Sequence, residues 1–135
     1  MDQEAVLFAN EAFYQAFTSR DLAAMDELWA VGQPVACIHP GWGSLDGRDA
    51  VMTSWRDILT NPNAPVIACR QPKAYVHGDL AFVICFEEID GNFLIATNVF
   101  VRRGSVWKMI HHQAGATAAK PAAEEAEGEL PIRPN

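Results

Sequence analysis

The second half of the chain alternates strand-forming segments with short glycine-containing turns, and this pattern constrains the fold most. Segments rich in β-branched and aromatic residues run over 66–77, 80–89, 92–102 and 105–114. They are separated by Gly78-Asp79, Asp90-Gly91 and Arg103-Gly104, which are typical of two-residue hairpin turns. Successive hairpins place their strands side by side, so the sequence predicts a four-stranded antiparallel meander.

The first half of the chain predicts helices. Apolar residues recur at helical spacing over 4–19 and over 51–59, and a shorter helix follows Asp21, which can cap it. Between them, the segment 35–39 reads as a short strand that ends before Pro40, and a glycine-rich loop over 41–47 follows. We therefore expect an α+β fold in which three N-terminal helices pack against a cone-shaped, curved meander with one additional short strand.

Length, charge and cysteine content exclude several classes of protein. The 135 residues suit one domain, expected over 4–115, followed by an Ala/Glu/Pro-rich tail over 116–135. The net charge of -7 and the scattered basic residues disfavour nucleic acid as a partner. The three cysteines form no paired spacing, and no apolar run reaches membrane-spanning length. We expect a cytoplasmic protein with no signal peptide and no membrane contact.

The last hairpin carries polar side chains on a face where a purely structural sheet would carry aliphatic ones. If Arg103-Gly104 is the turn, Arg102 pairs with Ser105 and alternation assigns the faces. One face then mixes aromatic, aliphatic and polar residues: Leu94, Ala96, Asn98, Phe100, Trp107, Met109, His111 and Gln113. Polar groups within an aromatic lining are typical of a small-molecule pocket.

The same register argument extends over the other strands. It places Arg70 opposite Glu87 and adds both to the mixed face. The opposite face gathers apolar residues: Ile67, Tyr75, Phe82, Ile84, Phe86, Ile95, Val99 and Ile110. Since helices can cover only one face of the sheet, we expect this outer face to meet a second copy of the chain in a homodimer.

Short motifs along residues 13–112 resemble the nuclear transport factor 2-like superfamily, which includes SnoaL-like polyketide cyclases and ketosteroid isomerases. The chain looks like a bacterial SnoaL-like member. The motifs are Phe13-Tyr14-Gln15-Ala16-Phe17, Asp21-Leu22, Ile38-His39-Pro40, Asp46-Gly47-Arg48 with Trp55, Thr97-Asn98-Val99-Phe100-Val101 and Trp107-Lys108-Met109-Ile110-His111-His112. The resemblance implies the fold, whereas activity varies among proteins that share it.

The resemblance also implies positions for catalytic groups. The catalytic base of ketosteroid isomerases falls on His39, and their second oxyanion donor falls on Asn98. Their oxyanion tyrosine falls on Phe13, with Tyr14 one residue away. Because a phenylalanine cannot donate a hydrogen bond, ketosteroid isomerisation is not expected. The comparison adds Trp55 to the predicted lining, together with Met109, His111 and Gln113 of the mixed face.

Most of these residues have a functional and a structural interpretation. His39 can act as a general base or simply end its strand, and Glu87 is an alternative base. Arg70 can orient a ligand or only pair with Glu87 across the strands. Trp42, between two glycines, can form a lid or pack on a partner. His111 and His112 are adjacent on a strand and point to opposite faces, so they cannot bind one metal ion together. A metal site would need His39, His111 and Glu87 to converge, and we expect neither a metal nor a cofactor.

Two functions therefore remain open. The first is a cofactor-free acid/base enzyme of isomerase, cyclase or dehydratase type that acts on a small hydrophobic carbonyl or carboxylate ligand. The second is a non-catalytic ligand-binding or dimeric assembly module.

Overall fold

The computed structural model describes residues 2–123. They form three helices and a six-stranded sheet, in chain order α1 (Asp2–Thr18), α2 (Leu22–Leu28), β1 (Ala36–Ile38), β2 (Leu45–Asp46), α3 (Arg48–Thr60), β3 (Ala68–His77), β4 (Leu80–Ile89), β5 (Asn92–Arg103) and β6 (Val106–Ala116). The predicted α+β class, the three helices and the antiparallel meander are confirmed. The short strand β2 was not predicted and lies within the glycine-rich loop.

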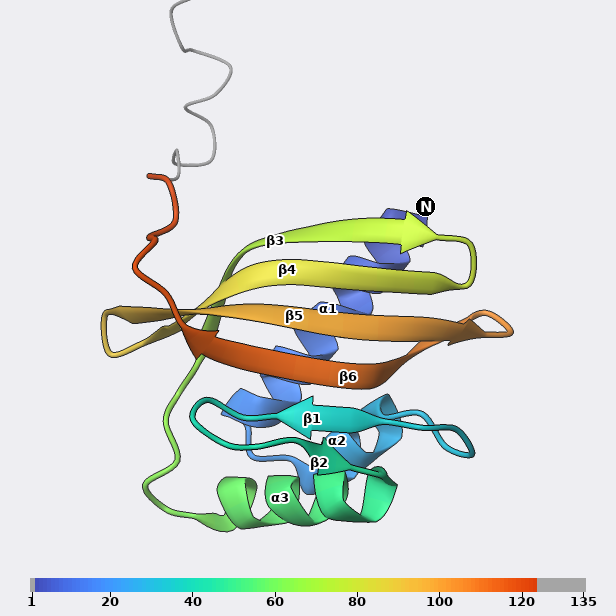
Figure 1. Ribbon diagram of the computed structural model, residues 1–135, viewed down its shortest axis with the longest axis horizontal. Helices are drawn as coiled ribbons and strands as arrows, with labels where there is room; N and C mark the ends of the chain where they lie inside the picture. Colours follow the sequence, from blue (N-terminus) through green and yellow to red (C-terminus); the bar gives the residue numbers. More distant parts are fainter. Residues whose placement is uncertain (1, 124–135) are drawn as a thin grey trace, which may run out of the picture.

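The sheet has the strand order β2-β1-β6-β5-β4-β3. Strands β3 to β6 pair antiparallel in sequence, while β1 joins β6 in parallel. Helix α1 crosses behind β3 to β6, and α2 and α3 lie beside β1 and β2 (Figure 1). The meander is therefore covered by helices on one face, which we call the inner face, and we call the opposite face the outer face.

Large apolar side chains fill the space between the helices and the inner face. Helix α1 buries Phe13 and Phe17 among them, and α3 contributes Trp55. Phe13 and Phe17 each meet the Trp55 ring edge-on, with ring centroids 5.5 and 5.3 Å apart. The Asp21 side chain accepts a hydrogen bond from the Ala24 backbone N–H at 3.0 Å and so caps α2 as expected.

The first two hairpins have the predicted register. His77 pairs with Leu80 across the first turn, and Ile89 pairs with Asn92 across the second. Along β4 and β5, three pairs follow as predicted, namely Val83 with Asn98, Cys85 with Ala96 and Glu87 with Leu94. Glu87 and Asn98 therefore lie on the inner face, where both are buried.

The last hairpin differs from the prediction in two ways. The turn residues are Gly104 and Ser105, so Arg103 pairs with Val106. A bulge then places Ile110 as an extra residue, because Phe100 pairs with Met109 whereas Val99 pairs with His111. From His111 onward, each side chain of β6 therefore lies on the face opposite to the predicted one.

His112 now pairs with Asn98 and is buried on the inner face at 2% exposure. The prediction that His111 and Gln113 belong to the mixed face was wrong, because the bulge turns them to the outer side. The His111 Nδ1 atom lies 2.9 Å from the backbone oxygen of Ala36 in β1.

A second bulge lies in β3, and because of it Arg70 is not opposite Glu87 as predicted. Gln71 has a φ of 52° and Pro72 lacks an N–H, so the register shifts between Arg70 and Lys73. Cys69 therefore lies opposite Glu87, and Arg70 instead pairs with Glu88, with Nε and Oε1 2.8 Å apart.

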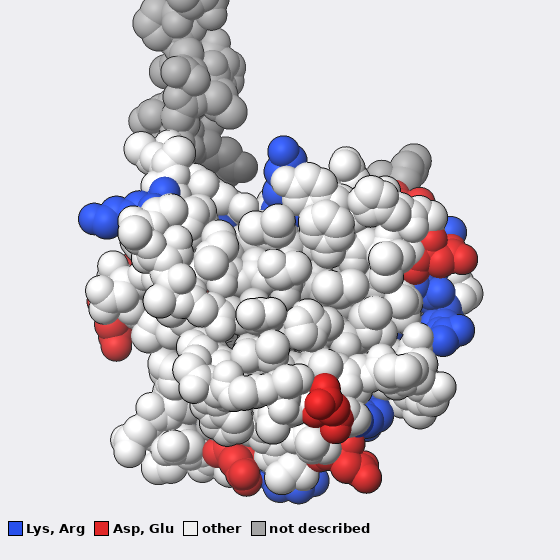
Figure 2. Space-filling view, in the orientation of Figure 1, with Lys and Arg blue, Asp and Glu red and all other residues white. Residues whose placement is uncertain are grey.

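The outer face is half-buried and largely free of charged side chains. Figure 2 shows its central area as uncharged, with lysine, arginine and acidic residues around the rim. Phe82, Ile84 and Val99 are among the half-buried residues of this face. Ile67, which was also expected there, is instead buried just before β3 and 6% exposed. An uncharged outer face is compatible with contact to another polypeptide.

The end of the chain is described only in part. Residues 117–123 form neither helix nor strand, and the Gln71 Nε2 atom donates a hydrogen bond to the Ala122 backbone oxygen at 2.7 Å. Residues 124–135 of the predicted tail lie outside the described residues. The predicted domain boundary stays a prediction. Of the helices within 2–123, none has both the length and the apolarity that crossing a membrane requires.

Candidate acid/base site

A buried carboxyl group lies at the centre of the space between the helices and the inner face. Glu87 is 2% exposed, and its Oε2 atom accepts a hydrogen bond from the Tyr14 hydroxyl at 2.7 Å. Burial raises the pKa of Glu87 from 4.5 to about 7, although the hydrogen bond from Tyr14 acts in the opposite direction. No lysine or arginine is among the buried residues of the described chain, so no buried cation offsets a negative charge on Glu87.

Asn98 joins this carboxyl group to the remaining polar side chains. Its Nδ2 atom donates to Asn10 Oδ1 at 2.9 Å and to the Tyr14 hydroxyl oxygen at 3.1 Å. Its Oδ1 atom lies 2.5 Å from His112 Nδ1. Because Asn98 Oδ1 can only accept, His112 carries its hydrogen on Nδ1, and its Nε2 atom is left as an acceptor. That Nε2 atom lies 3.9 Å from Glu87 Oε2.

Both interior histidines are held in the neutral form. Burial lowers the pKa of His112 to about 3, with a further contribution from the neighbouring His39. Burial alone lowers the pKa of His39 to about 4. Protonation of either ring would place an unpaired charge in the interior, so near pH 7 the two rings offer hydrogen bonds rather than charge.

The ring orientation of His39 follows from its neighbour Ser54. The Ser54 hydroxyl donates to the Val51 backbone oxygen at 2.6 Å, so it accepts from His39 Nε2 at 2.9 Å. His39 Nδ1 is consequently the acceptor atom of this ring. The ring lies edge-on to Trp55 and Trp42, with centroids 4.8 and 4.9 Å away.

Three thiols border the same polar cluster. The Cys85 Sγ atom is 3.3 Å from the Tyr14 hydroxyl oxygen, and the Cys69 Sγ atom accepts from Asn10 Nδ2 at 3.6 Å. Cys37 Sγ lies 3.7 Å from His39 Nε2, and burial raises the pKa of this thiol to about 12. A thiol with a raised pKa is a poor nucleophile, so Cys37 contributes packing rather than reactivity.

The structure buries seven of the predicted site residues together and leaves four others outside this buried group. Those buried together are Phe13, Tyr14, His39, Trp55, Glu87, Asn98 and Met109. Trp42 is 49% exposed and covers His39 from outside. Arg70, His111 and Gln113 lie outside the polar cluster.

Three interior polar residues were missed by the sequence prediction, namely Asn10, Ser54 and His112. Asn10 lies one helical turn before Tyr14, so a polar residue on the core-facing side of α1 was the available signal. His112 had no comparable signal, because only the bulge turns it inward.

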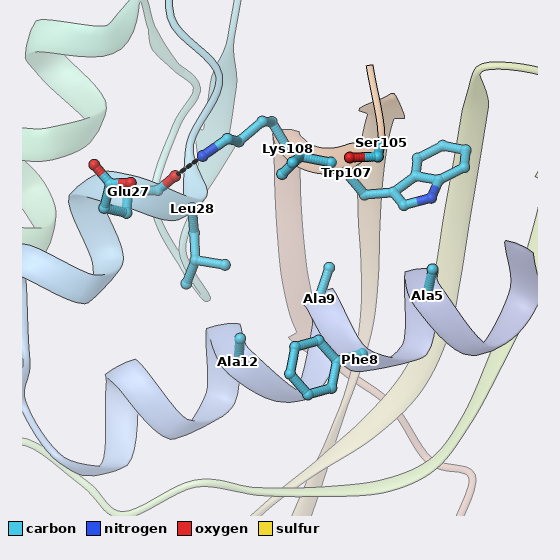
Figure 3. Close-up of a pocket in the computed structure, with 10 residues that line it drawn as sticks. Ala5, Phe8, Ala9, Ala12, Glu27, Leu28, Ser105, Trp107 and Lys108 are labelled. Carbon is cyan, nitrogen blue, oxygen red and sulfur yellow. Dashed lines mark hydrogen bonds between the residues drawn. The ribbon is translucent and has the colours of Figure 1, made fainter. Parts of the chain in front are cut away.

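Two hollows on the surface differ in their relation to this cluster. One of about 390 Å³ is lined by Trp42, Thr53 and Ser54, two of which touch His39. Another of about 420 Å³ lies between α1, α2 and the start of β6, and Figure 3 shows Phe8 and Trp107 on its sides. The second hollow contains none of the predicted site residues, whereas the first borders two residues in contact with His39; neither is lined by Glu87, Tyr14 or Asn98.

Comparison with known proteins identifies the family. A sequence model of the SnoaL-like domain matches residues 6–119. The chain belongs to the SnoaL-like family. A structure from Streptomyces avermitilis, of a protein named as a candidate dehydratase of the NTF2-like family, is 34% identical with a TM-score of 0.79. The match covers 87% of this chain and 97% of that chain.

Two other relatives of this SnoaL-like chain carry different names. A structure from Thiobacillus denitrificans, named as a candidate calcium/calmodulin-dependent protein kinase type II association domain, is 31% identical with a TM-score of 0.72. It is matched over 81% of this chain and 92% of that chain. The F-box protein SKIP8 of Arabidopsis thaliana is 27% identical over 112 residues, which are 82% of this chain and 48% of SKIP8. The chain thus spans about half the length of this curated relative.

Within residues 2–123, no three histidine, cysteine, aspartate or glutamate side chains are grouped as a bound metal ion would require. The expectations of no metal, no cofactor, no nucleic-acid partner and a cytoplasmic location stay predictions.

Proposed function

We propose that the chain is a SnoaL-like acid/base enzyme that moves a proton next to the carbonyl group of a small hydrophobic ligand, with Glu87 carrying the proton. The observation that supports this most is the raised pKa of Glu87, about 7, in the buried interior between the helices and the inner face. A group whose pKa lies near the working pH can both accept and return a proton. His39, with its pKa near 4, is a weaker base and serves as a neutral hydrogen-bonding group.

A dehydration of a β-hydroxycarbonyl compound illustrates the proposed chemistry. The Glu87 carboxylate takes the proton from the carbon beside the carbonyl, and the C–H electrons form the enolate. The carbon–oxygen bond at the β position then breaks, a carbon–carbon double bond forms, and Glu87 returns its proton to the leaving hydroxide as water. Tyr14 and Asn98 are the neighbouring donors, and to stabilise the enolate oxygen they have to turn a hydrogen away from their present acceptors, Glu87 for Tyr14 and Asn10 or Tyr14 for Asn98. The relative named as a candidate dehydratase favours this variant of the chemistry.

Entry of a ligand requires the side chains over His39 to move. Trp42 is 49% exposed and follows Gly41, whose φ is 83°, so it sits in a loop rather than in regular structure. The hollow of about 390 Å³ lies against Trp42 and Ser54. We infer that Trp42 swings aside to admit the ligand, as a lid does.

Proton exchange in heavy water tests the proposal without knowledge of the natural substrate. A panel of small ketones and β-hydroxycarbonyl compounds is incubated with the protein, and NMR follows deuterium entering the carbon beside the carbonyl. We expect exchange with the wild type and a loss of at least a hundredfold with Glu87→Gln. Glu88→Gln, the matched change on the outer side of β4, should leave exchange intact.

Histidine variants test whether His39 rather than Glu87 is the base. His39→Ala should reduce exchange by roughly tenfold or less if His39 only forms hydrogen bonds. Complete loss of exchange in His39→Ala would show that His39 is the base. His77→Ala, at an exposed position, is the control and should not change exchange. If Glu87→Gln exchanges as fast as the wild type, the proposal is wrong.

A second proposal concerns assembly. The uncharged outer face (Figure 2) and the relative named as an association domain support a homo-oligomer, with the dimer through this face as the simplest form. Sedimentation velocity tests it with Ile84→Lys at the centre of the face. The change should yield monomers, whereas Phe8→Lys, at an exposed position of α1, should not.

A further inference from the structure

Two of the three thiols that border the polar cluster lie against each other. Cys69 of β3 pairs with Glu87 of β4, and Cys85 lies two residues before Glu87 on β4, so alternation places both sulfurs on the inner face. The Cys69 thiol donates a hydrogen bond to the Cys85 sulfur. Both cysteines are free, so two reduced sulfurs are in direct contact across neighbouring strands.

Helix α1 fixes the arrangement of the two sulfurs. The Cys69 Sγ atom accepts from Asn10 Nδ2 at 3.6 Å, and the same amide group hydrogen-bonds Cys85. The Cys85 Sγ atom also lies 3.3 Å from the hydroxyl oxygen of Tyr14, one helical turn further along α1. Asn98 donates to both Asn10 and Tyr14. The pair is thus held from one side by side chains that are themselves hydrogen-bonded.

The pair lies where the interior borders solvent. Strand β3 is an edge strand of the sheet, and its bulge between Arg70 and Lys73 follows directly after Cys69. Cys69 is half-buried, whereas Cys85 is 1% exposed. Because the two sulfurs are in contact, a small solute that reaches Cys69 is also next to Cys85. An irregular edge strand opens locally more readily than a central one, which gives such a solute access.

The contact makes the two sulfurs chemically unequal. The hydrogen bond from Cys69 lowers the pKa of Cys85, although burial acts in the opposite direction, and the same bond raises the pKa of Cys69. Cys85 is therefore the sulfur that ionises first, with a protonated thiol beside it. A thiolate with a second thiol in reach is the arrangement from which a disulfide forms. Cys37, by contrast, lies against His39 and has a raised pKa.

We propose that Cys69 and Cys85 form a modification site that a hydroperoxide oxidises to a reversible disulfide. The Cys85 thiolate attacks one oxygen of hydrogen peroxide, the oxygen–oxygen bond breaks, and a sulfenic acid and hydroxide form. The Cys69 sulfur then attacks the sulfenic sulfur, the sulfur–oxygen bond breaks, and water leaves with the Cys69 proton. In total the two thiols lose two electrons and two protons, and one hydrogen peroxide becomes two water molecules.

The position of the pair favours a disulfide that is easily reduced again. Cys85 lies diagonally across from Cys69, and diagonal positions on neighbouring strands are farther apart than directly opposed ones. A disulfide there is strained, and strained disulfides are the ones that serve in regulation. The bond ties the edge strand β3 to β4 beside Glu87. The site needs only the two thiols and the oxidant, so it is independent of proton transfer at Glu87.

Peptide mapping after treatment with hydrogen peroxide tests the proposal on the full chain. The remaining thiols are alkylated in denaturant, and tryptic peptides are analysed by mass spectrometry without reduction. Trypsin places Cys37, Cys69 and Cys85 on the separate peptides 21–48, 57–70 and 74–102, so each pairing has its own mass. We expect the Cys69–Cys85 pairing to exceed each pairing with Cys37 by roughly tenfold or more. Dithiothreitol should remove it.

Variants and the unfolded chain serve as controls. Cys69→Ser and Cys85→Ser should each abolish the crosslink, whereas Cys37→Ser, the matched control, should form it as the wild type does. The chain unfolded in urea should lose the preference for one pairing, because the contact is gone. The wild-type result decides by itself, even if a variant fails to fold. The proposal is overturned if both thiols stay free at peroxide concentrations that oxidise the unfolded chain, or if pairings with Cys37 are equally abundant in the folded protein.

Discussion

Strands β4 and β5 present Glu87 and Asn98 on the inner face of the meander and Ile84 and Val99 on the outer face. The inner polar groups are almost completely buried and form hydrogen bonds with other buried polar side chains. The outer residues are apolar and only partly buried. The usual arrangement of a one-sided sheet, polar outside and apolar inside, is thus partly inverted here.

The two faces differ in what each one costs in stability and in what could compensate for it. Burying polar groups lowers stability unless each one has a partner, so a buried polar cluster is kept where its chemistry is used. Leaving apolar groups on the surface is unfavourable in a monomer, so it is kept where another surface covers it. The inner face therefore suits ligand chemistry and the outer face suits assembly.

The largest expected effect is on the inner face at Asn98. Asn98→Ala removes the group that bonds Asn10, Tyr14 and His112, and leaves all three without that partner. We expect the free energy of unfolding to fall by about 4 kcal/mol, measured by chemical denaturation. Its outer-face neighbour Thr97→Ala should lower it by less than about 1 kcal/mol. Equal losses in the two variants would remove the distinction between the faces.

The next effect is the pH dependence that Glu87 confers. Its folded-state pKa of about 7 lies above the ordinary 4.5, so the folded protein holds this proton more tightly than the unfolded chain does. The stabilisation is complete below pH 4.5 and is lost as the pH rises to about 7. Relative to Glu87→Gln, the wild type should lose about 3 kcal/mol of unfolding free energy over that range. A difference that does not change with pH would contradict a buried, poised carboxyl group.

A smaller effect is expected at Tyr14. Tyr14→Phe removes the hydrogen bond that lowers the pKa of Glu87, so this pKa should rise further above 7. The unfolding free energy should fall by about 1 to 2 kcal/mol. Carbon NMR of the carboxyl group gives the pKa, and Tyr75→Phe on the outer face is the control. An unchanged pKa would show that Tyr14 does not tune the site.

The smallest effect on folding is expected at the outer face. Ile84→Lys should change the unfolding free energy of the dilute protein by less than about 1 kcal/mol, because Ile84 is only partly buried in the monomer. Denaturation at several protein concentrations measures this directly. The wild type should become more stable with concentration and the variant should not. Loss of several kcal/mol at high dilution would mean that Ile84 belongs to the core of the monomer.

The prediction from the sequence includes the meander but neither of its two bulges. Asp90-Gly91 and Gly78-Asp79 fix the registers that bring Glu87 and Asn98 inward, because short turns leave few alternatives. The bulge at Ile110 leaves no such signal, since an isoleucine fits either face of a strand. Pro72 was a usable signal for the other bulge, because a proline cannot donate to the ladder.

These bulges explain the errors in the predicted site. Arg70, His111 and Gln113 were placed by alternation, and each lies beyond a bulge that reverses it. His112 is the converse case, since the same reversal brings it to Glu87. Residues on the turn side of each bulge, including Met109, were assigned to the correct face.

The pKa of Glu87 in the wild-type protein tests the central claim most directly. Carbon NMR of the selectively labelled carboxyl group follows its ionisation as the pH is raised. We predict a midpoint near 7, because burial raises the pKa of Glu87 by more than the hydrogen bond from Tyr14 lowers it. A midpoint at the ordinary 4.5 would contradict the account, because the carboxyl group would then be an ordinary anion at neutral pH and a poor carrier of protons.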